Sequence, residues 1–155
     1  MTKQDIFSVI RNGDLKALKA LVDNDKESVN RLNEQGFSPL IIAGYGNHLE
    51  TVKFLIEHGA TVNGLDAAGN TALMGVCFKG YIEVAKLLID NEADINIKNS
   101  QGATALIYTA MFGQSELAKL LLDQGADPEI ADNSGNTALM HAQKKGDATI
   151  VALLS

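Results

Sequence analysis

Histidine and cysteine are the residue types of this 155-residue chain that most often act as catalysts or metal ligands. His48, His58 and His141 do not form a His-Glu-x-x-His pattern, in which two histidines on one helix bind zinc. Cys77 is the single cysteine, so the chain forms no internal disulfide and no cysteine-based zinc site. We expect Cys77 to be a small buried hydrophobic residue, because a reactive thiol needs exposure and a neighbouring cation.

Phosphate-binding and calcium-binding patterns are not indicated either. Gly44-Tyr45-Gly46 lacks the preceding strand and the third glycine of a dinucleotide-binding loop. Asp66, Asp127 and Asp132 do not have the alternating spacing of oxygen ligands in a calcium loop. The residue pattern therefore predicts no catalytic residues, no metal site and no cofactor.

Composition indicates a folded protein whose net charge disfavours generic binding to nucleic acid. The chain is 46% hydrophobic and 21% charged, and its net charge of −6 opposes binding to nucleic acid. It contains no apolar run of about 18 residues, so we expect no membrane span. The apolar stretch at residues 6–10 is too short for a signal peptide before Arg11 interrupts it. We therefore expect a cytoplasmic monomer.

A five-residue phrase that begins with glycine returns every 33 residues. It starts at Gly36, Gly69, Gly102 and Gly135. A fixed period of this length is typical of stacked supersecondary units. Apolar residues recur with the same period on two predicted helices, at Leu40, Leu73, Leu106 and Leu139 on the first, and at Phe54, Leu87, Leu120 and Leu153 on the second. We expect the central Leu73 and Leu106 to lie in the core.

Turn residues also recur with this period. The chain between the two helices requires a left-handed residue, and the position is occupied by Asn47, Gly80, Gly113 and Gly146. A second glycine position follows the outer helix, at Gly59 and Gly125. Glu92 occupies it in the third unit, which predicts a strained turn and a higher melting temperature for Glu92→Gly.

The first 32 residues resemble an atypical end unit, as expected at the end of a stack. Thr2 is expected to cap a first helix that carries residues 6–10, and Gly13 ends that helix. A second apolar segment follows at helical spacing, and residues 24–28 are expected to form a polar, irregular tail.

The repeated phrases resemble the ankyrin repeat. Residues 38–43 and 137–142 are similar to its Thr-Pro-Leu-His-x-Ala phrase, and residues 121–127 are similar to its Leu-Leu-x-x-Gly-Ala-Asp ending. The Thr-Ala-Leu-Met form of the phrase is similar to ankyrin proteins of bacteria. The resemblance implies an all-α repeat fold, an ankyrin-type α-solenoid of helix-turn-helix units with short β-turn or hairpin loops. It implies one domain over residues 1–155, with units at 1–32 (N-terminal cap), 33–65, 66–98, 99–131 and 132–155 (truncated C-terminal cap).

The chain departs from the family phrase at its histidine. Ile41, Met74, Ile107 and Met140 stand in that position. We expect packing by these apolar side chains in place of the hydrogen bonds of the histidine.

The resemblance also implies where a partner binds. In ankyrin-like repeats the concave surface is built from loop residues and from the last two positions of each inner helix. In this chain those positions carry apolar and basic side chains, namely Arg11, Phe37, Tyr45, Leu65, Phe78, Lys79, Met111, Phe112, Lys144 and Lys145. Phe7, Phe54 and Tyr108 are expected to pack between helices instead.

An apolar strip with basic flanks has the anchors and the steering charges of a protein-binding surface. We therefore expect a non-catalytic protein–protein interaction module, acting as an adaptor, an inhibitor or a regulatory subunit. Its partner would present an acidic or amphipathic segment. The alternative is a small-molecule or metabolite sensor with a pocket around Tyr45, Phe78, Phe112 and Lys79.

Overall fold

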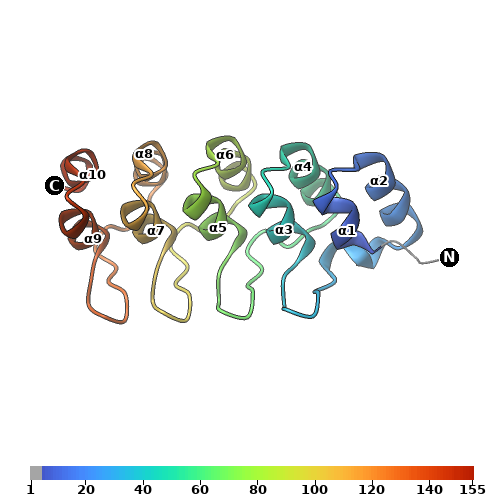
Figure 1. Cartoon of the computed structure of the whole chain (residues 1–155), viewed down its shortest axis with the longest axis horizontal. Helices are drawn as coiled ribbons and strands as arrows, with labels where there is room; N and C mark the ends of the chain where they lie inside the picture. Colours follow the sequence, from blue (N-terminus) through green and yellow to red (C-terminus); the bar gives the residue numbers. More distant parts are fainter. Residues whose placement is uncertain (1–4) are drawn as a thin grey trace.

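The computed structural model describes residues 5–155, which form a single row of five helix pairs (Figure 1). The inner helices are α1 (Ile6–Arg11), α3 (Pro39–Tyr45), α5 (Ala72–Lys79), α7 (Ala105–Met111) and α9 (Ala138–Lys145). The outer helices are α2 (Leu15–Asn24), α4 (Leu49–Glu57), α6 (Ile82–Asp90), α8 (Ser115–Asp123) and α10 (Ala148–Leu154). The part of the chain described contains no strand and no helix long and apolar enough to cross a membrane. The all-α repeat solenoid predicted from the 33-residue period is confirmed.

Each inner helix after α1 begins at a hydroxyl residue. The side-chain oxygens of Ser38, Thr71, Thr104 and Thr137 accept a hydrogen bond from the backbone N–H three residues later, at 3.2–3.3 Å. This bond satisfies one of the free amides at a helix start, so it fixes where each helix begins. Because all four caps recur with the period, the last turns of α3, α5, α7 and α9 fall in corresponding places.

The N-terminal unit differs from the expectation in two places. Asp5 caps α1, because its carboxylate accepts the backbone N–H of Ser8 at 2.8 Å; the prediction that Thr2 is the cap is wrong, and Thr2 lies outside the described residues. The polar tail after α2 is not irregular, since a short 3-10 helix (Lys26–Asn30) forms there. The Ser28 hydroxyl donates to the carbonyl of Asp25 at 2.6 Å and stabilises this turn.

The predicted left-handed turns are confirmed. The four residues between inner and outer helices have positive φ angles, at 57° for Asn47, 85° for Gly80, 69° for Gly113 and 75° for Gly146. The position after the outer helix is also left-handed, at Gly59, Glu92 and Gly125. Glu92 adopts φ 69°, which is an unfavourable conformation for a residue with a Cβ atom. The strained turn expected there is present.

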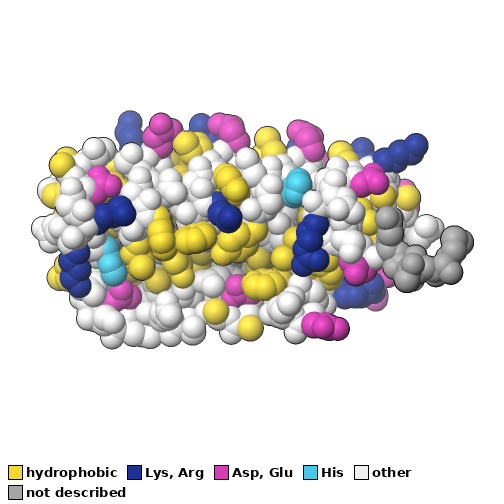
Figure 2. Space-filling view, in the orientation of Figure 1, with side chains coloured by type: hydrophobic (Ala, Val, Ile, Leu, Met, Phe, Trp, Pro, Cys, Tyr) yellow, Lys and Arg dark blue, Asp and Glu magenta, His cyan; other side chains and the backbone are white. Residues whose placement is uncertain are grey.

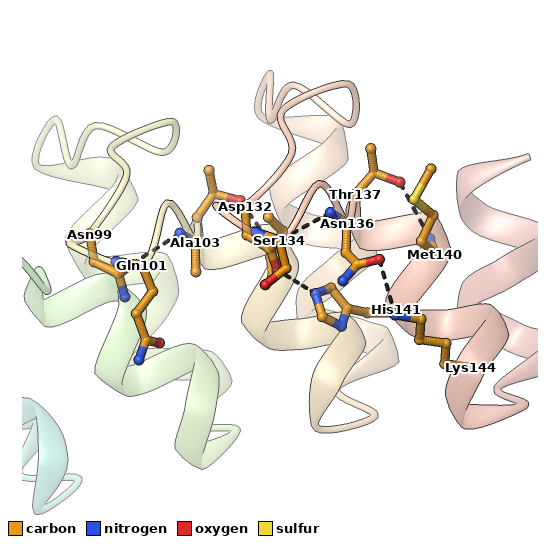
Figure 3. Close-up of polar contacts among 12 residues, drawn as sticks. Asn99, Gln101, Ala103, Asp132, Ser134, Asn136, Thr137, Met140, His141 and Lys144 are labelled. Atoms are coloured by element: carbon orange, nitrogen blue, oxygen red, sulfur yellow. Dashed lines mark hydrogen bonds and ion pairs between the residues drawn. The ribbon is translucent and has the colours of Figure 1, made fainter.

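The loops between units all project to one side of the row (Figure 1). Each loop tip closes by two backbone hydrogen bonds, as in Asp66 N–H to Asn70 O at 2.9 Å and Gly69 N–H to Asp66 O at 3.0 Å. One side-chain oxygen of the first loop residue accepts two further backbone N–H groups, two and four residues later; this residue is Asn33, Asp66, Asn99 or Asp132. Figure 3 shows these bonds at Asn99 and Asp132.

Asparagine side chains join consecutive units. Asn63 donates its Nδ2 to the carbonyl of Glu92 at 3.2 Å and accepts the N–H of Asp94 at 2.7 Å. Asn30 and Asn96 make the same pair of bonds to their own following units. These clamps tie each of the first three units to the unit that follows it.

A continuous core runs the length of the row between the helix layers. The predicted core residues Leu73 and Leu106 are each 1% exposed. Ile41, Met74 and Ile107 are 1–3% exposed, so apolar packing does replace the family histidine in three units. Met140 is 43% exposed and contradicts that expectation. The helices that carry the other three side chains, α3, α5 and α7, each contact the inner helix of the following unit, whereas no inner helix follows α9 among the described residues.

Candidate functional site

Large apolar side chains lie exposed at the C-terminal ends of three neighbouring inner helices. Tyr45 ends α3, Phe78 is in the last turn of α5, and Met111 and Phe112 end α7. Each of the four is 38–42% exposed, although all lie beside the core. Figure 2 shows hydrophobic side chains gathered in a band along the middle of this face. This part of the predicted surface is thus exposed to solvent.

The aromatic rings of the band contact one another across three units. The Phe78 and Phe112 centroids are 4.6 Å apart at 88°, and those of Tyr45 and Phe78 are 6.4 Å apart at 60°. Tyr108 stacks on Phe112 at 6.2 Å and 13°. We call these four residues the aromatic strip. Edge-to-face contacts hold the rings in defined orientations, so the strip is ordered before any partner arrives.

Tyr108 was missed as a site residue. It was expected to pack between helices, as Phe7 and Phe54 do at 8% and 7% exposure. Tyr108 is half-buried and packs against the core as expected, and its ring also contacts Phe112 in the strip. One turn before Phe112 on a helix, it lies on the same helical face, which is the spacing that could have identified it.

Basic side chains accompany the strip. The Lys79 Nζ lies 5.9 Å from the centroid of the Tyr45 ring, within the range of a cation–π contact. Arg11 at the end of α1, and Lys144 and Lys145 at the end of α9, are exposed. Lys144 also donates to the Asn136 side-chain oxygen at 3.0 Å (Figure 3). Figure 2 shows Lys and Arg side chains beside the band and towards its two ends.

Two predicted residues are not brought into the ring cluster. Phe37 is half-buried and packs against the core, so it offers a partner less area than the strip residues do. Leu65 is 51% exposed in the loop that precedes α5. Neither makes a ring contact with the aromatic strip among the described residues.

A depression of about 180 Å³ lies within the strip. Its lining comprises Tyr45, Asn70, Met74, Gly75, Phe78, Tyr108 and Phe112. Sites for drug-sized ligands usually measure about 300–1,000 Å³. The depression is smaller than this range and open to solvent on one side, and Lys79 does not line it.

A chain of hydrogen bonds fixes the polar edge of the depression. Asn99 donates its Nδ2 to the Asn70 side-chain oxygen at 2.8 Å and to the Tyr108 hydroxyl at 2.9 Å. Partial burial raises the pKa of the Tyr45 hydroxyl, and nearby Tyr108 and Asp66 raise it further. Tyr45 therefore remains protonated and uncharged at neutral pH.

His58 and Cys77 make their contacts within the fold. His58 donates from Nδ1 to the Phe54 carbonyl at 2.9 Å, and its ring lies 4.0 Å from the Phe54 ring. Cys77 is completely buried, and burial raises the pKa of its thiol to about 12. Among residues 5–155, no three His, Cys, Asp or Glu side chains are grouped so that they could hold a metal ion.

His141 forms a half-buried pair with Asp132. Its Nε2 lies 2.8 Å from Asp132 Oδ2, as Figure 3 shows. Burial alone would raise the pKa of Asp132. The hydrogen bonds from His141 and from the N–H groups of Asn136 and Ser134 outweigh burial and lower that pKa below its ordinary value. The pair therefore ties α9 to the loop before it.

The chain matches a protein-family model over almost its whole length. That family is described as ankyrin repeats (3 copies), and its model aligns with residues 6–99 and 92–155.

Curated relatives share shorter segments. The chain is 38% identical over 56 residues to BTB/POZ domain-containing protein 3 of Schizosaccharomyces pombe, which is 36% of this chain and 11% of that protein. It is 37% identical over 59 residues to palmitoyltransferase akr1 of Aspergillus oryzae, which is 38% of this chain and 8% of that protein. It is 34% identical over 58 residues to ankyrin repeat and SAM domain-containing protein 6 of Mus musculus, which is 37% of this chain and 7% of that protein. The matched segments thus span about a tenth of these relatives or less, and the transferase name describes that protein alone.

Proposed function

Since this chain belongs to the ankyrin-repeat family, whose repeats are generally non-catalytic protein–protein interaction modules, we propose that it binds a protein partner through the aromatic strip. In this proposal it acts as an adaptor, an inhibitor or a regulatory subunit. The cytoplasmic location, the monomeric state and the single domain over residues 1–155 belong to the same proposal.

One observation carries the proposal: rings from three successive units contact one another and stay 38–42% exposed. Scattered exposed apolar residues are ordinary, but a contiguous and ordered group of rings marks an interaction surface. Aromatic side chains are enriched among the residues that contribute most to binding energy, because they bury large areas at low entropic cost. Phe78 contacts both Tyr45 and Phe112, so we place the centre of the interface there.

Charge favours an acidic or amphipathic partner segment. The chain carries a net charge of −6, yet Arg11, Lys79, Lys144 and Lys145 accompany the strip. Positive side chains beside an apolar surface attract carboxylates and accelerate encounter with an acidic segment. The small volume of the depression favours a protein segment over the metabolite of the alternative hypothesis.

A defined selection tests this function. A displayed library of random 12-residue peptides is selected against the full chain, and affinities of enriched peptides are measured by fluorescence anisotropy. We expect sequences that combine apolar and acidic residues, with at least a tenfold loss of affinity for the Phe78→Ala/Phe112→Ala variant.

Leu49→Ala serves as the control, because Leu49 is 36% exposed on the outer helix α4. Circular dichroism establishes that every variant is folded. Peptides that bind the double variant as tightly as the native chain would contradict the proposal.

A further inference from the structure

The depression in the strip exists because one residue is small. Gly75 on α5 occupies the position that Ile42, Tyr108 and His141 occupy in other units, 33 residues apart. A Cβ atom at Gly75 would approach a carbon of the Tyr45 ring to 2.9 Å. Glycine therefore lets the Tyr45 ring lie against α5 and leaves the space above the helix unfilled.

The size of the depression matches one side chain. A dry cavity of about 150 Å³ accommodates benzene, which has six carbon atoms. The depression has about 180 Å³ and is lined mainly by aromatic rings and Met74, with Asn70 at one edge. An apolar group the size of Leu or Phe fills such a space, whereas a longer ligand would extend beyond it.

The polar groups near the depression are suited to a partner's backbone carbonyl and to a partner's carboxylate. The Tyr108 hydroxyl accepts its bond from Asn99, so its own proton can be donated to a carbonyl of a partner. Asp66 is committed to its own loop, because its oxygens accept bonds from Ala68 and Asn70. Lys79 lies over the Tyr45 ring and disfavours a second cation there.

We propose that the depression binds a single apolar side chain of the partner, of the size of Leu or Phe, next to a carboxylate that pairs with Lys79. This anchor rests on the proposed function and makes it specific: the partner segment carries a Leu-acid or Phe-acid pair. A cationic side chain such as lysine is excluded from the same depression.

Designed peptides test the anchor separately from the surface. The probes are 12-residue peptides of Glu, Ser and Gly with one central guest residue, Leu, Ala or Lys, followed by Glu or Gln. Affinities for the full chain are measured by fluorescence anisotropy. We expect the Leu peptide to bind at least tenfold more tightly than the Ala peptide, and the Lys peptide to bind no better than the Ala peptide.

Two variants locate the anchor. Gly75→Ala places a methyl group in the lining, too close to the Tyr45 ring for that wall to keep its position, and Phe112→Ala removes another wall. Either should reduce the preference for Leu over Ala to about twofold or less. Gly44→Ala is the matched control, because Gly44 is a helical glycine outside the lining and Cys77 and Ala110 occupy its position in the next two units. Its added Cβ would lie 3.2 Å from Val76 Cγ2, so circular dichroism and urea titration establish that this variant folds. Lys79→Gln should abolish the preference for Glu over Gln and leave the preference for Leu intact.

The outcomes separate the two proposals. An undiminished preference for Leu in Gly75→Ala and Phe112→Ala overturns the anchor. Equal binding of the Leu and Ala peptides to the native chain, including no binding of either, also overturns it. Neither result overturns the proposed binding surface, which is tested by the random-library peptides. That proposal is overturned only when those peptides bind Phe78→Ala/Phe112→Ala as tightly as the native chain.

Discussion

Replacing Glu92 by glycine should stabilise this protein. Glu92 follows α6 in the left-handed conformation at φ 69°, where Gly59 and Gly125 stand in the neighbouring units. Among the described residues its carboxylate forms no hydrogen bond or ion pair. Its backbone carbonyl accepts the Asn63 clamp, which the substitution retains. The side chain therefore contributes strain without a compensating contact.

The expected gain is the difference of two terms. Relief of the left-handed conformation is worth about 1–2 kcal/mol. Glycine also increases the entropy of the unfolded chain, which costs about 0.5–1 kcal/mol. The net stabilisation is thus about 0.5–1 kcal/mol. A protein of this size gains about 2–4 °C per kcal/mol, so the melting temperature should rise by about 1–4 °C.

Thermal unfolding by circular dichroism, with urea titration beside it, measures this change. Glu92→Ala separates backbone strain from charge, because the acidic group also lies near the negative end of α6. Gly125→Ala is the reverse control; nothing lies within 4 Å of a Cβ placed there, so it introduces strain alone and should destabilise. An unchanged or lowered stability of Glu92→Gly would refute the reasoning. Equal stabilisation by Glu92→Ala would assign the effect to charge.

Three further predictions concern the core, the thiol and the last unit. Leu106→Ala should lower the free energy of unfolding by about 2–5 kcal/mol in urea titration, because Leu106 is 1% exposed; a loss below about 1 kcal/mol would contradict its place in the core. Cys77 should not react with a disulfide reagent at about pH 8 in the native protein but should react in concentrated urea, since its pKa is raised to about 12; equal rates in both states would contradict its burial. The lowered pKa of Asp132 stabilises the fold above about pH 4, and this contribution is lost as pH falls through the folded-state pKa. Asp132→Asn should retain the loop hydrogen bonds, because Asn99 makes the same bonds at the equivalent position of the preceding unit. The urea midpoint of this variant should therefore fall less steeply between about pH 5 and pH 2 than that of the native chain. Parallel curves would contradict this assignment.

The architecture was predictable because it repeats. Each unit presents the same backbone requirement, so a left-handed turn appears in sequence as glycine at a fixed interval, with Asn47 and Glu92 as the exceptions. The hydroxyl caps and the apolar helix faces follow the same rule. A backbone requirement that recurs in every unit places the same residue type at a fixed interval, and a single sequence is enough to show this interval.

Contacts between units were harder to predict. Asn30, Asn63 and Asn96 recur every 33 residues, so their importance was visible in the sequence. Their partners were not, since each side chain bonds to backbone atoms some 30 residues later, in the following unit. A backbone carbonyl or N–H can belong to almost any residue type, so the sequence does not show which residue the asparagine bonds to. The exposure of Met140 was missed for a related reason, because burial at this position depends on the next helix and not on the residue.

The depression was missed because the position that forms it is not periodic: it holds Ile42, Gly75, Tyr108 and His141 in successive units. Gly75 is a glycine inside a helix, where it costs about 1 kcal/mol relative to alanine and has no turn to make. Such a residue indicates a close approach, and here the approaching group is the Tyr45 ring. A search for glycines inside predicted helices, away from any turn, would have found Gly75 without coordinates.

Substitutions at the periodic positions should therefore change mainly the free energy of unfolding, and substitutions at the aperiodic positions should change mainly peptide binding. Caps, loop tips and asparagine clamps hold the backbone, and substitutions there change the stability of the stack while the strip keeps its geometry. The exposed rings of Tyr45, Phe78 and Phe112 lie at the ends of inner helices whose positions are already determined by those bonds. Substituting them removes little buried area, so it should alter which peptides bind far more than it alters the free energy of unfolding. A partner-binding surface can change on such a scaffold at small structural cost, because the residues that build the fold and those that face the partner are largely separate sets.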